Sequence, residues 1–168
     1  MDHAAPTTSA VKAETSPFAA IDAVPKDPKV QSAVRKTFEL DPTDPVRFRT
    51  QIKQLEEHNV FFSNNDVVKA RTGKSFEPEN RGRSNFETRE TFIDESLIGE
   101  ALSGGTKGAS ALSTLRSEIF HEVIGREILH HAPNLGKMPI SITESAVMRN
   151  FAVSHPGVVR DLLTRAGS

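Results

Sequence analysis

The 168 residues are enough for one domain, and the 36% hydrophobic and 26% charged residues are typical of a globular protein. Because 21 Lys and Arg residues nearly balance 22 Asp and Glu residues, the formal charge of -1 provides no global field that would attract nucleic acid or an anionic membrane. The lack of cysteine excludes disulfides, thiolate zinc ligands and a cysteine nucleophile.

The first 27 residues are rich in Ala, Ser, Thr and Pro, and few of them could join a core. We therefore expect residues 1–27 to be a disordered leader and residues 28–168 to form a single domain. The leader resembles the export segments of bacterial effectors, and the sequence has neither a basic-then-apolar signal peptide nor an apolar run of about 20 residues. The resemblance implies secretion without a cleaved signal peptide into a host cytosol. The alternative is a cytoplasmic protein with a solvated tail.

Two helices are predicted in the first part of the domain, one beginning at Pro28 and one at Pro45. The proline- and aspartate-rich segment 41–45 forms the turn between them, and the second helix runs to His58. The loop predicted next, over 72–85, contains glycines, a proline and mixed charge. The apolar residues that define the two helices recur every three or four positions: Val30, Val34 and Phe38, then Val46, Phe48, Ile52 and Leu55.

The second part of the domain is expected to contain one strand and several helices. Residues 86–94 (FETRETFID) alternate imperfectly and include Thr and Phe, so we predict a strand at the edge of a small sheet. Short helical or turn structure is predicted over 97–102, and three glycines, at positions 104, 105 and 108, separate it from the longest helical pattern. Helices are predicted over 109–131, 142–153 and 158–165. Together these elements predict an α+β fold dominated by helices.

The helix predicted over 109–131 has two distinct faces. One is a core stripe made of Leu112, Leu115, Ile119, Phe120, Val123 and Ile124. Beside it lies the polar strip, which we define as Thr114, Ser117, Glu118, His121 and Gly125. Since positions i and i+4 share a helix face, Ser117 and His121 lie on consecutive turns with Glu118 alongside.

The segment Ser117-Glu118-Ile119-Phe120-His121 resembles the His-Glu-x-x-His helix of zincin metallopeptidases, with serine at the first histidine position. The resemblance extends over about 86–153 and implies a zinc cofactor and a protein or peptide substrate. It assigns Glu118 as the general base, His121 as the second zinc ligand and Glu144 as the third. Ser117 marks the position of the missing ligand.

A neutral hydroxyl is a poor zinc ligand, so the resemblance implies a degenerate peptidase. Three accounts remain open: an inactive relative that still binds its target, an engineered inactive form, or a site completed by another residue such as His155. The alternative class is a non-enzymatic helical interaction module. In that case His121 lies at the edge of a core helix, and Glu144 caps a helix start as the partner of Ser141.

Two further motifs are rejected as sites. Thr72-Gly73-Lys74-Ser75 resembles the end of a phosphate-binding loop, but a valine stands where that loop requires its earlier glycine. A second Glu-x-x-His, from Glu127 to His130, lies in the last turns of the same helix. There we expect His130 and His131 to complement the helix C-terminus.

Overall fold

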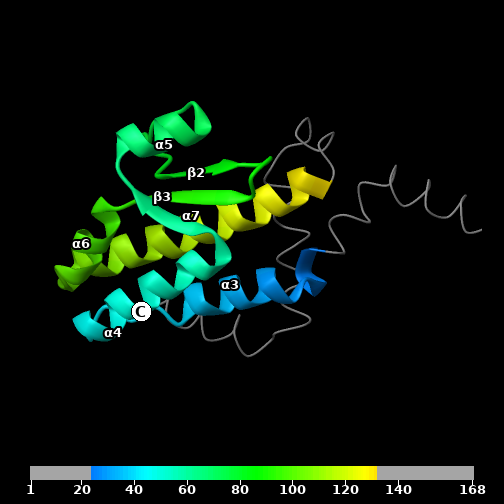
Figure 1. The fold of residues 1–168 in the computed structure, drawn as a ribbon. Helices are drawn as coiled ribbons and strands as arrows, with labels where there is room; N and C mark the ends of the chain where they lie inside the picture. Colours follow the sequence, from blue (N-terminus) through cyan, green and yellow to red (C-terminus); the bar gives the residue numbers. More distant parts are fainter. Residues whose placement is uncertain (1–23, 132–168) are drawn as a thin grey trace, which may run out of the picture.

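The structure is a computed structural model, and it describes residues 24–131 (Figure 1). Helices dominate this part of the chain and pack with a three-stranded mixed sheet, which confirms the predicted α+β class. The helices predicted over 142–153 and 158–165 lie outside the described residues. The helical elements are η1 (Val24–Lys26), α3 (Pro28–Phe38), α4 (Pro45–Gln54), η2 (Leu55–His58), α5 (Asn65–Thr72), α6 (Ser96–Leu102) and α7 (Gly105–His131).

The layers follow one another as α5, the sheet, α7 and α3 (Figure 1). The sheet contains β1 (Val60–Ser63), β2 (Gly82–Asn85) and β3 (Glu90–Asp94) in the order β1-β3-β2. Strand β1 is parallel to β3, and β2 is antiparallel to it. One face of the sheet packs on α7, so α7 lies between the sheet and α3 at the centre of the hydrophobic core.

Helices α3 and α4 begin at Pro28 and Pro45, as the sequence predicted, and in the structure an aspartate caps each of them. Asp27 accepts a hydrogen bond from a backbone N–H of the first turn of α3, and Asp44 does the same for α4. Each aspartate is followed by a proline, whose fixed φ and missing N–H suit the first helical position. The predicted second helix ends with a 3-10 turn, η2, before Asn59 in the left-handed conformation starts β1.

The folded domain begins earlier than the predicted boundary between residues 27 and 28. Val24 is 2% exposed and belongs to the hydrophobic core, and η1 packs against α3. Asp27 is also part of the fold, because it caps α3. Composition placed these residues in the leader because Val24 is one of few apolar residues in a segment rich in alanine, serine, threonine and proline. The rest of the leader, residues 1–23, lies outside the described residues.

The strand predicted over 86–94 is shorter than expected and occupies a different place. Only Glu90–Asp94 forms strand β3, and it is the central strand of the sheet, so the predicted edge position is wrong. The first part of the segment forms the turn between β2 and β3, where Arg89 has a φ of 57°. Strand β2 lies within residues 72–85, which the sequence predicted to be a loop. The prediction missed it because the β2 sequence, GRSN, has no apolar side chain that would indicate a strand.

Helix α7 confirms the core stripe but begins at Gly105, four residues before the predicted start at 109. Positive φ angles at Gly104 and Gly105 turn the chain between α6 and α7. Gly108 lies inside the helix, where a Cβ atom would approach the Ala101 carbonyl oxygen to 3.0 Å. This glycine therefore permits a close crossing of α6 and α7, rather than ending a loop.

Two glycines of α7 allow a matched test of this crossing. Gly108→Ala should lower the free energy of unfolding by about 1–3 kcal/mol, because its methyl group meets a backbone carbonyl that cannot move alone. Gly125→Ala should raise it by about 0.5–1 kcal/mol, since alanine is the better helix former. A Cβ at Gly125 meets no described atom within 4 Å. Urea unfolding of both variants checks the signs, and equal stabilisation by the two changes would contradict the close crossing.

Candidate functional site

The polar strip of α7 lies beside β2. A Cβ atom at Gly82 would stand 2.9 Å from Glu118 Oε2 and 2.9 Å from Glu122 Cγ, so both glutamates pack against the strand backbone. Ser84 Oγ fixes the same strand to the helix, donating a hydrogen bond of 3.1 Å to the Glu122 carbonyl oxygen. The absence of a side chain at Gly82 is what allows this approach.

The environment of Glu118 disfavours its charged form. Its Oε2 atom is buried without a hydrogen-bond partner in the described part of the chain. Burial is the main cause that raises the pKa of Glu118, and the charge of Glu122 adds to the rise. The charge of His121, the backbone N–H of Arg81 and the charge of Arg83 oppose it. A carboxyl group in this setting holds its proton more readily than a free glutamate.

The other residues predicted for the zinc site differ in exposure, and some of them lie outside the described residues. Ser117 is exposed and His121 is half-buried, one helical turn apart. The structure therefore brings Ser117, Glu118 and His121 together on the strip, with Glu118 turned toward β2. Glu144 and His155, the other ligand candidates, lie outside the described residues. Within residues 24–131, no three His, Asp or Glu side chains are grouped as a metal site would require.

The second Glu-x-x-His is part of a buried ionic network. Glu127 is 4% exposed and accepts hydrogen bonds from Arg126, at 3.2 Å, and from Arg89. His130 and His131 contact the β2–β3 turn, through the Phe86 carbonyl oxygen (3.2 Å) and the Arg89 guanidinium (3.3 Å). Sequence reasoning missed this network, because only the fold brings Arg89 of the β2–β3 turn to the neighbouring residues Arg126 and Glu127 of α7. The only signal in the sequence is the position of Arg126 and Glu127 beside the core stripe.

The Thr72-Gly73-Lys74-Ser75 segment ends a helix instead of starting one. Thr72 is the last residue of α5, and Gly73 caps it with a φ of 83°. Thr72 Oγ1 donates back to the Val68 carbonyl oxygen at 2.8 Å. A phosphate-binding loop must present backbone N–H groups at a helix N-terminus, and a helix C-terminus carries the opposite dipole. This geometry agrees with the rejection of the motif.

Comparisons with known proteins leave the family open: no protein-family model, curated protein or solved structure matches this chain. Between residues 24 and 131, none of the helices combines the length and the apolar character that a membrane crossing needs.

The raised pKa of Glu118 predicts a pH-dependent stability. Above the folded-state pKa, the ionised carboxylate destabilises the fold, so Glu118→Gln should raise the free energy of unfolding at pH 7 by about 0.5 kcal/mol. This difference should shrink as the pH falls toward 4.5, the ordinary pKa of a glutamate, because the wild-type carboxyl group becomes protonated in both states.

Glu100 provides a control of opposite sign. Its hydrogen bonds to Arg81 lower its pKa, so Glu100→Gln should destabilise the protein at pH 7 and lose this effect as the pH falls. Unfolding curves at pH 4 and pH 7 measure both variants. A Glu118→Gln protein that is less stable than wild type at pH 7 would contradict the described burial.

Proposed function

We propose that this chain is a protein-binding domain that resembles a zinc peptidase and lacks a working catalytic site. The observation that carries the proposal is the polar strip of α7, which has serine at the first ligand position and its glutamate directed at β2. The residues of the strip do not fit zinc, because His121 is its only imidazole and a serine hydroxyl is a weak ligand.

The position of Glu118 supports the loss of catalysis independently of the missing histidine. A general base must lie within hydrogen-bond reach of the water that it activates. Here Oε2 is buried against the Gly82 backbone and has no hydrogen-bond partner in the described part of the chain, so this oxygen is turned away from a water on the open side of the strip. We therefore infer that the domain acts on its protein or peptide target by binding it, and that it does not hydrolyse the target.

A matched pair of substitutions tests the zincin part of the proposal. Ser117→His should create a site for one zinc ion per chain, because it sets two imidazoles one turn apart with Glu144 as the third ligand. The wild-type chain should bind zinc weakly or not at all, and Ser117→His combined with Glu144→Ala should lose the ion. The readout is zinc content after dialysis, together with hydrolysis of a fluorescent casein.

Ser113→His is the control, since it introduces the same histidine at an exposed position eight residues from His121. At about 1.5 Å rise per residue, that spacing is too long for one metal ion to bridge. If Ser117→His binds no zinc, or keeps it without Glu144, the zincin arrangement is wrong. The helical interaction module, with no link to peptidases, then takes its place.

Secretion of the chain as a bacterial effector is also part of the proposal. Its support is the Ala-, Ser-, Thr- and Pro-rich composition of residues 1–27. A reporter enzyme fused to residues 1–27 should leave a bacterium that has a needle-type secretion system, and it should stay inside a mutant that lacks the system. Retention in both strains would favour the cytoplasmic alternative.

A further inference from the structure

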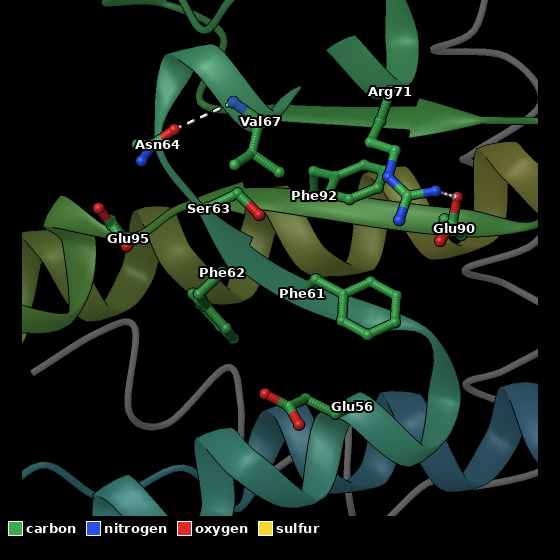
Figure 2. Close-up of a pocket in the computed structure, with 10 residues that line it drawn as sticks. All are labelled: Glu56, Phe61, Phe62, Ser63, Asn64, Val67, Arg71, Glu90, Phe92 and Glu95. Atoms are coloured by element: carbon green, nitrogen blue, oxygen red, sulfur yellow. Dashed lines mark hydrogen bonds and ion pairs between the residues drawn. The ribbon is translucent and has the colours of Figure 1, made fainter. Parts of the chain in front are cut away.

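A groove of 340 Å³ lies along β1, at the opposite edge of the sheet from β2 (Figure 2). Phe61 and Phe62 extend from β1, and Val67 of α5 lies above Phe92 in the same view. The rim of the groove includes Glu56 of η2 and Glu95, which directly follows β3. We define the β1 groove by six of its lining residues: Glu56, Phe61, Phe62, Val67, Phe92 and Glu95.

The main chain of β1 is suited to adding a strand. Among the described strands, β1 pairs only with β3. The carbonyl oxygens of Asn59 and Ser63 accept hydrogen bonds from the β3 side. Since backbone groups alternate in direction along a strand, the N–H and C=O groups of Phe62 point away from β3. An extended peptide can bind to such an edge through its own backbone.

The groove also presents an apolar surface next to this edge. The rings of Phe61 and Phe92 contact each other, with centroids 5.9 Å apart. Val67 is 44% exposed and lines the groove, whereas the next residue of α5, Val68, is fully buried. An alternating peptide would place every second side chain against these residues.

The negative charge on the rim of the groove favours a basic partner. Glu90 pairs with Arg71 at 3.9 Å, so these two charges compensate each other. Glu56 and Glu95 are exposed, and no basic side chain in residues 24–131 forms an ion pair with either. The rim is therefore acidic overall. A partner with lysine or arginine near its apolar residues complements it.

We propose that the β1 groove binds an extended basic segment of another protein by strand addition. The apolar side chains of the segment pack on Phe61 and Val67, beside the buried ring of Phe92, and its basic side chains pair with Glu56 and Glu95. The site is separate from the polar strip of α7, which borders the other edge of the sheet. It does not depend on whether the chain descends from a peptidase.

Two fluorescein-labelled nonapeptides test the proposal on the full chain, one alternating valine with lysine and one alternating valine with glutamate. In fluorescence anisotropy, the lysine peptide should bind at least about tenfold more tightly, and added salt should weaken it. Replacing both rim glutamates, Glu56→Gln with Glu95→Gln, should remove this preference. Equal binding of the two peptides to the wild-type chain would overturn the proposal.

A second comparison locates the binding site. Val67→Lys puts a positive charge into the groove and should weaken the lysine peptide by at least about tenfold. Val46→Lys is the matched control, because Val46 is 78% exposed on α4 and does not line the groove. If both variants bind the peptide alike, the groove is not the docking surface.

Two controls separate this proposal from its alternatives. Ser117→His should leave peptide binding unchanged, so the zinc experiment and this one can fail independently. A lysine peptide methylated on alternate backbone nitrogens should bind less tightly than the unmethylated peptide, because strand addition needs those N–H groups. Failure of the wild-type chain to bind the lysine peptide would overturn the proposal. If the chain then formed a dimer in sedimentation experiments, the groove would be assigned to binding a second copy of this chain.

Discussion

The buried guanidinium of Arg126 is the contact on which the arrangement of α7 and the sheet depends. It donates hydrogen bonds to the carbonyl oxygens of His58 (2.6 Å) and Asn59 (2.8 Å) and to Thr91 Oγ1 (3.1 Å), and it pairs with Glu127. Burial lowers the pKa of Arg126, yet a guanidinium remains charged in proteins. A buried charge is tolerated only when its hydrogen bonds are satisfied. The left-handed turn at Asn59 and strand β3 must therefore keep their places against α7.

A second buried arginine secures the other half of the helix. Arg116 donates to the carbonyl oxygens of Phe38 (3.2 Å) and Leu40 (2.7 Å), beyond the last intrahelical bonds of α3. Carbonyl groups at a helix C-terminus lack partners within the helix, and a cation there also complements the helix dipole. Arg116 therefore holds the end of α3 against α7, and Arg126 holds β3 and the turn that precedes β1. With α7 fixed in this way, the two edge strands of the sheet, β1 and β2, can carry different surface side chains without changing the core.

Local patterns predicted helices α3, α4 and α7 but not α5. The prolines at the starts of α3 and α4 and the core stripe of α7 are short-range signals, and each is found in the structure. Helix α5 has one buried residue, Val68, so it shows no apolar period. Strands β1 and β2 are four residues long, too short to show a period, and GRSN has no apolar residue. The order β1-β3-β2 depends on contacts between distant segments, so no local pattern could reveal that β3 is central. The closeness of Glu118 to β2 depends on Gly82, which the sequence shows only as a loop glycine.

The two edges of the sheet differ in how their strands are held. Beside β2, Asn85 donates to the Arg71 carbonyl oxygen and Arg83 to that of Ser75, so side chains of the strand tie it to the preceding segment. Its backbone at Gly82 lies over Glu118. Unprotected edges favour pairing with other chains, and proteins usually shield them with charge, proline or a covering segment. Strand β1 has two phenylalanines instead, with no shielding segment among the described residues. Among the described residues, side chains of β2 tie that strand to neighbouring segments, whereas the backbone of β1 pairs only with β3, so β1 is the edge at which an added strand would meet unpaired backbone groups.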